Sequence, residues 1–98
     1  MSQRSNRPRA RFPLGDIVAT PGAIEALREA KQTPLALLVR HQRGDWGDLC
    51  EEDKAENEFS LTHDLRLLSA YTLPTEVKIW VITEWDRSVT TRLLPSEY

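Results

Sequence analysis

The sequence has little cysteine and no long hydrophobic run, and each shortage excludes a class of protein. Its single cysteine, Cys50, cannot form a disulfide within the chain, which is typical of proteins in a reducing cytosol. The longest purely apolar run, Leu35–Val39, has only 5 residues, whereas a membrane-spanning helix needs about 20. No apolar segment follows the arginines near the N-terminus, so a signal-peptide pattern is lacking. We therefore expect a cytoplasmic protein without a membrane segment.

Motifs for cofactors and metals are also lacking. The segment Thr20-Pro21-Gly22 has neither the glycines nor the lysine of a phosphate-binding loop. The spacing of His41, Asp45 and Asp48 matches no established metal-ligand signature. Cys50 precedes three acidic residues, which disfavour its thiolate. We expect no cofactor and no metal site.

The charge of the chain is unevenly distributed. The whole chain of 98 residues has a net charge of −2. Residues 1–11 contain no acid and carry +4, and the remaining 9 basic and 15 acidic residues give residues 12–98 a charge of −6. The pattern predicts a disordered basic leader at 1–11 and a single acidic domain at 12–98. Nucleic-acid contact is expected only through the leader, at Arg4, Arg7, Arg9 and Arg11.

Three helices are predicted in the first two thirds of the chain. Thr20-Pro21 and Thr33-Pro34 are both typical helix starts, with a capping hydroxyl followed by proline at the first helical position. The short link between these two helices indicates a helical hairpin. Asp48 and Glu51 have the spacing of a capping box and predict a third, surface helix over about 49–59.

The hydrophobic period changes to two after Leu65. Alternation over 67–73, 77–83 and 89–93, with short links, predicts a three-stranded antiparallel meander. A further short strand is predicted at 17–19, before the first helix. The expected fold class is α+β: a short N-terminal strand, a helical hairpin plus a third surface helix, and then the meander, with the helices on one face of the sheet.

Two tryptophans indicate a binding surface. Trp46 and Trp85 fall in predicted loops beside acidic residues, and exposed aromatic side chains are typical binding anchors. The alternative is that each ring folds back against an edge of the core. The binding surface predicted from this pattern consists of Asp45, Trp46, Asp48, Trp85, Asp86 and Arg87.

Residues 12–98 contain a specific combination of segments: Phe12–Gly15, Val18–Ala23, Arg40-His41, Gly44–Leu49, Glu52–Lys54, Leu68–Tyr71, Ile79–Glu84 and Asp86–Pro95. Together these segments resemble a family of small plasmid-related bacterial proteins found on mobile elements and chromosomes. The resemblance implies a bacterial cytosolic accessory protein in a mobile-DNA setting, and it implies no activity. Trp85 departs from it, because similar sequences carry a small residue there.

The order of strand, helical hairpin and meander is also similar to that of RelE/ParE-like toxins. This similarity implies a ribonuclease, for which the residues able to move protons or hold phosphate are His41, Glu84, Arg87 and Tyr98. The acidic body counts against that alternative, because RNA affinity depends on contacts with phosphate.

The favoured hypothesis is a non-enzymatic protein-binding module with a regulatory or host-defence-modulating role. The alternatives are the ribonuclease toxin and a small DNA-associated factor that uses the N-terminal arginines. The sequence leaves open the identity of the protein partner and the oligomeric state.

Overall fold

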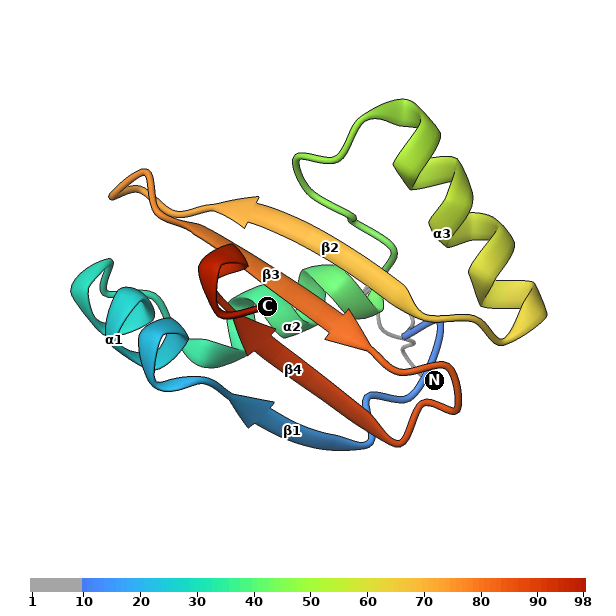
Figure 1. Ribbon diagram of the computed structural model, residues 1–98, viewed down its shortest axis with the longest axis horizontal. Helices are drawn as coiled ribbons and strands as arrows, with labels where there is room; N and C mark the ends of the chain where they lie inside the picture. Colours follow the sequence, from blue (N-terminus) through green and yellow to red (C-terminus); the bar gives the residue numbers. More distant parts are fainter. Residues whose placement is uncertain (1–9) are drawn as a thin grey trace, which may run out of the picture.

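The computed structural model describes residues 10–98 and confirms the α+β class. It contains a sheet of 4 strands, three α-helices and a final 3₁₀ turn (Figure 1). In chain order the elements are β1 (Asp16–Ala19), α1 (Pro21–Glu29), α2 (Pro34–Gln42), α3 (Glu51–His63), β2 (Leu67–Thr72), β3 (Lys78–Thr83), β4 (Val89–Leu93) and η1 (Pro95–Glu97).

The predicted meander is present, and the N-terminal strand joins it to make a mixed sheet. Strands β2, β3 and β4 are antiparallel neighbours, and β1 pairs with β4 in parallel, which gives the order β1-β4-β3-β2. Ile17 lies opposite Thr90 and Ala19 lies opposite Arg92. The first and last strands of the chain, β1 and β4, therefore lie side by side (Figure 1).

The helix starts agree only in part with the sequence prediction. Thr20 is the N-cap of α1, and its hydroxyl accepts a hydrogen bond from the Ala23 N–H at 3.2 Å. The prediction that Asp48 caps the third helix was wrong, because α3 begins after Cys50, which makes no side-chain cap. The Asp48 carboxylate instead accepts a hydrogen bond from the Thr72 hydroxyl at 2.7 Å.

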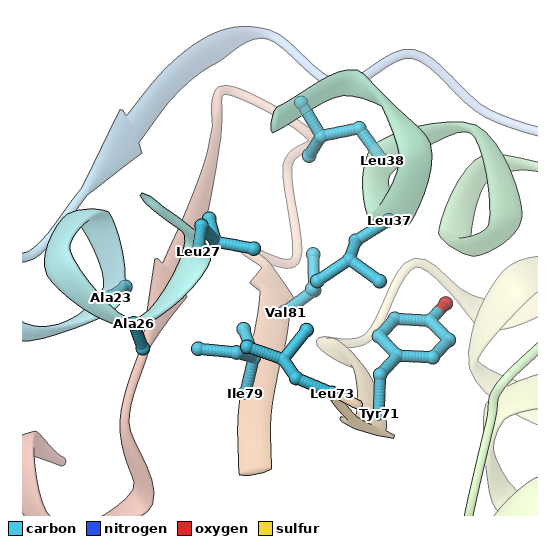
Figure 2. Close-up of a cluster of buried hydrophobic side chains, with 9 residues drawn as sticks. All are labelled: Ala23, Ala26, Leu27, Leu37, Leu38, Tyr71, Leu73, Ile79 and Val81. Atoms are coloured by element: carbon cyan, nitrogen blue, oxygen red, sulfur yellow. The ribbon is translucent and has the colours of Figure 1, made fainter. Parts of the chain in front are cut away.

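Helices α1 and α2 cover one face of the sheet, and the main core lies between them and the strands. Figure 2 shows the helical side chains pointing toward those of β2 and β3. The alternation of the strands places every second side chain on this face. The buried cluster consists of Ala23, Ala26, Leu27, Leu37, Leu38, Tyr71, Leu73, Ile79 and Val81.

No helix within residues 10–98 is long and apolar enough to span a bilayer.

Helices α1 and α2 do not cover the opposite face of the sheet. Helix α3 lies beside β2, and the C-terminal turn η1 lies over β3 and β4 (Figure 1). The Tyr98 ring contacts the edge of Trp80, with 5.7 Å between ring centroids. We call this side the open face, because α1 and α2 lie on the other side of the sheet. Trp80 is accordingly half-buried rather than buried.

Candidate functional site

Trp46 lies in the core and not on a binding surface. Only 3% of the residue is exposed, and its indole N–H donates to a Glu58 carboxylate oxygen at 3.0 Å. Its ring stacks on Phe12 and meets the His41 ring edge-on, at centroid distances of 6.4 Å and 5.8 Å. Of the two interpretations of this tryptophan, the structure supports the one in which the ring closes an edge of the core.

The two aspartates beside Trp46 fasten their loop to the rest of the domain. The Asp45 carboxylate accepts a hydrogen bond from the Arg40 Nε at 2.7 Å, and this contact lowers the pKa of Asp45. The Asp45 carbonyl accepts the hydroxyl of the buried Tyr71 at 2.6 Å. Asp48 is held by Thr72, as described above. Both carboxylates therefore already have partners within the domain.

The β3–β4 hairpin is also held by internal contacts, except at Trp85. The Asp86 carboxylate accepts hydrogen bonds from the N–H and hydroxyl of Ser88, at 3.1 Å and 2.6 Å. Trp85 remains 62% exposed. The Arg87 guanidinium donates to the carbonyl oxygens of Ser60, Leu65, Glu84 and Trp85, so it joins the end of α3 to the hairpin.

The structure does not bring the predicted binding residues together. Asp48 lies at the Thr72 end of β2, whereas Arg87 contacts Leu65, just before the other end of that strand. At about 3.3 Å per residue, the six residues of β2 separate the two groups by roughly 17 Å. Of the predicted aromatic anchors, only Trp85 is exposed.

His41 belongs to a buried chain of hydrogen bonds. Its Nδ1 lies 2.6 Å from the Ser69 Oγ and its Nε2 lies 2.9 Å from the Thr83 Oγ1. Thr83 contacts Thr90 at 2.7 Å, and Thr90 donates to the Leu14 carbonyl at 2.7 Å. Because Thr90 spends its proton on that carbonyl, Thr83 must donate to Thr90, and His41 Nε2–H to Thr83. Nδ1 is paired with the Ser69 hydroxyl and accepts its proton when the imidazole is neutral.

The environment of His41 opposes its protonation. The residue has 0% exposure, and burial lowers its pKa to about 3, with a further contribution from the positive charge of Arg87. Both ring nitrogens are engaged within the core, and no position on the ring faces solvent. This geometry suits a structural histidine rather than a general base.

The residues of the ribonuclease alternative lie on opposite faces of the sheet. His41 bonds to Ser69 and Thr83 on the helix-covered face, whereas Tyr98 packs on Trp80 on the open face. Glu84 and Tyr98 do come near each other, because Arg66 contacts both side chains. The four residues therefore form no common pocket. Arg66 was not singled out from the sequence, since nothing local marks it as the link.

The β2 edge of the sheet is closed by side-chain and loop contacts. The Asn57 amide donates to the Leu68 carbonyl at 2.6 Å and accepts from the Leu68 N–H at 3.1 Å. The Ala70 N–H donates to the Trp46 carbonyl, and the Ala70 carbonyl accepts the Asp48 N–H. Gly47 has a φ of +80° and lies against the Ala70 carbonyl, where a Cβ would overlap that oxygen. The outward backbone groups of Leu68 and Ala70 are thus paired.

The opposite edge, at β1, is open. The N–H groups of Asp16 and Thr20 donate to β4 and its flank at 2.9 Å and 3.0 Å, so alternate residues of β1 point toward the sheet. The N–H and C=O groups of Ile17 and Ala19 point the other way, and within residues 10–98 no strand pairs with them. Ile17 and Val18 are each 45% exposed.

A cleft of about 430 Å³ lies between α1 and the β1–β4 side of the sheet. One cationic group in its wall has an unusual environment. Arg92 has a buried Nε without a hydrogen-bond partner among residues 10–98, and burial lowers the pKa of its guanidinium. The lining residues are Ala19, Ile24, Leu27, Arg28, Gln32 and Arg92.

The basic leader lies almost wholly outside the described residues, including Arg4, Arg7 and Arg9. Arg11 is described, and its guanidinium donates to both Glu58 carboxylate oxygens, at 3.0 Å and 2.8 Å. This contact raises the pKa of Arg11 and lowers that of Glu58. Arg11 is therefore engaged with the acidic body rather than presented to a phosphate backbone.

Metal-ligating side chains do not gather in the described part of the chain: within residues 10–98, no three histidine, cysteine or carboxylate side chains are grouped so as to hold an ion.

Comparison of the sequence with family models and curated proteins, and of the fold with solved structures, finds no match. The functional argument therefore depends on the geometry of this chain.

Proposed function

We propose that the protein is a protein-binding module that receives an extended segment of its partner along β1. One observation carries this proposal, namely the different treatment of the two sheet edges. Asn57 and the Trp46–Asp48 loop close the β2 edge, whereas the backbone of Ile17 and Ala19 has no such cover within residues 10–98. Proteins usually protect exposed edges, and an open edge is the site at which a partner strand adds.

The side chains of β1 favour the same mode of binding. Ile17 and Val18 point to opposite faces of the sheet because successive strand residues alternate. Both are exposed, so an added strand would gain main-chain hydrogen bonds and bury apolar surface on each face. The charge of −6 on residues 12–98 favours a protein over a nucleic acid as the partner.

The proposal extends to a regulatory or host-defence-modulating accessory role in the bacterial cytosol, in a mobile-element setting. That part depends on the resemblance to plasmid-related proteins. The ribonuclease alternative has less support, because His41 is enclosed and lies on the other face of the sheet from Tyr98.

An edge-specific variant tests the mode of binding. Ile17→Pro removes an N–H that points away from β4, whereas Val18→Pro removes one that points toward β4 and so breaks the sheet. Ile17→Val is the matched control that keeps the N–H and the β-branched side chain. The assay is affinity capture from a bacterial lysate, followed by titration of the purified partner and amide hydrogen exchange of the complex.

The expected result has two parts. The partner protects the Ile17 and Ala19 amides from exchange, and Ile17→Pro weakens binding while Ile17→Val does not. Retention of full affinity by a folded Ile17→Pro protein, or protection confined to residues outside β1, would contradict the proposal.

A further inference from the structure

The cleft beside α1 combines apolar walls with one uncompensated cation. Ile24, Leu27 and Ala19 supply the apolar wall, and Ile24 is 50% exposed. The cleft volume of about 430 Å³ lies within the range of small-molecule sites. A few polar groups in an otherwise apolar wall are what fix the orientation of a ligand in such sites.

Arg92 is the residue of the cleft with a buried polar atom that lacks a hydrogen-bond partner within residues 10–98. Three other arginines of the domain have acceptors: Arg40 has Asp45, Arg66 has Glu84, and Arg87 has four carbonyls. The buried Nε of Arg92 has none within residues 10–98. A buried donor without an acceptor carries the full cost of desolvation. Arg92 also lines the cleft, so an anionic oxygen bound there would lie beside its guanidinium.

The surroundings of Arg92 select a single negative charge. Arg28 also lines the cleft, but it pairs with Glu25 at 3.1 Å and is mostly exposed. Many phosphate sites use the N–H groups at a helix N-terminus. At α1 that position is already filled, because the Glu97 carboxylate accepts the Gly22 N–H at 3.0 Å and Thr20 accepts the Ala23 N–H. One available guanidinium matches a carboxylate better than a dianion.

We propose that this cleft binds an aliphatic carboxylate, with its carboxylate on Arg92 and its hydrocarbon part against Ile24 and Leu27. The site differs from the β1 edge, since the ligand contacts side chains on the helix-covered face and needs no backbone group of Ile17. The carboxylate can come from a free acid or from the C-terminus of a peptide. Both sources present the same chemistry to Arg92.

Titrations followed by amide NMR shifts test the site in the full-length protein. Octanoate represents a free acid, N-acetylleucine represents a peptide C-terminus, and octanol lacks the charge. The expected result is saturable shifts at Ala19, Leu27 and Arg92 with at least one of the two carboxylates. Tighter binding of octanoate identifies a free acid as the source, and tighter binding of N-acetylleucine identifies a peptide end.

Two variants separate the charge from the shape of the cleft. Arg92→Met keeps an unbranched side chain and should weaken carboxylate binding by about tenfold or more, as expected for loss of a charge-assisted hydrogen bond. Arg28→Gln changes the other arginine of the lining and should leave binding nearly unchanged. Ile17→Pro should also leave it unchanged, which separates this site from strand addition.

Three outcomes would overturn the inference: no saturable binding of either carboxylate, binding of octanol as tight as that of octanoate, or undiminished binding to a folded Arg92→Met protein. Arg92→Lys retains the charge and should keep part of the affinity. None of these outcomes bears on the β1 edge, so the proposed function is tested separately.

Discussion

Asn57 occupies the place of a neighbouring strand beside Leu68. Its side-chain amide donates to the Leu68 carbonyl and accepts from the Leu68 N–H, at 2.6 Å and 3.1 Å, which is the pairing that a backbone amide would provide. The residue is 5% exposed although it lies on a helix with few apolar residues. Helix α3 is therefore held to β2 by a polar contact that also closes the edge of the sheet.

Replacement of Asn57 should both destabilise the protein and expose the β2 edge. Asn57→Ala leaves the Leu68 N–H and C=O without partners and should lower the free energy of unfolding by about 1–3 kcal/mol. The neighbouring Glu56 is exposed, so Glu56→Ala is the matched control and should change stability by less than about 0.5 kcal/mol. Urea unfolding gives both values, and equal stabilities of the two variants would contradict the assigned role.

Truncation of the two loop tryptophans should change the stability of the protein by very different amounts. Trp46→Ala removes a ring that packs on Phe12 and His41 in the core and should cost about 3–5 kcal/mol. Trp85→Ala removes an exposed ring and should change stability by about 0.5 kcal/mol or less. Thermal or urea unfolding of the pair provides the measurement. A strongly destabilised Trp85→Ala protein would show that the hairpin ring packs in solution.

These tryptophans also show what the sequence could and could not predict. Period-two alternation predicted β2, β3 and β4 because each strand has one face on the core. Trp46 and Trp85 have similar acidic neighbours, so local sequence alone could not tell that Phe12, distant in the chain, covers one of them. The parallel pairing of Ile17 with Thr90 is likewise made between distant segments, and the contact of Asn57 with Leu68 joins two consecutive elements whose relative placement has no local signal.

The buried His41 should make stability fall in mild acid. Its pKa is lowered from 6.5 to about 3 in the folded protein, so the unfolded chain binds the proton first. The contribution of neutral His41 to the free energy of unfolding is fully present above about pH 6.5. Between pH 6.5 and pH 3 the free energy of unfolding falls by about 1.4 kcal/mol for each pH unit. Urea midpoints between pH 7 and pH 4 measure the decline.

His41→Gln tests the source of that pH dependence. Glutamine does not titrate, so the decline between pH 7 and pH 4 should become shallower in this variant even if its stability at pH 7 is lower. The exposed His63 offers the control, because His63→Gln should keep the steep decline. Identical slopes in the wild type and His41→Gln would assign the acid sensitivity to carboxylates instead.

Arg92→Met should stabilise the unliganded protein. Arg92 lies opposite Ala19 in the parallel pair, and its buried Nε lacks an acceptor within residues 10–98. Methionine keeps an unbranched side chain in the cleft and removes the cost of the unpaired donor, so the free energy of unfolding should rise by about 1 kcal/mol. Arg28→Met removes an exposed surface pair and should stay within about 0.5 kcal/mol. Thermal unfolding without ligand measures the stability of both variants, and its repetition with octanoate measures the effect of the ligand. Octanoate should raise the melting temperature of the wild type more than that of Arg92→Met, because only the wild type has the guanidinium that the carboxylate binds. A fall in stability on Arg92→Met without ligand would mean that the charge already has a partner in solution.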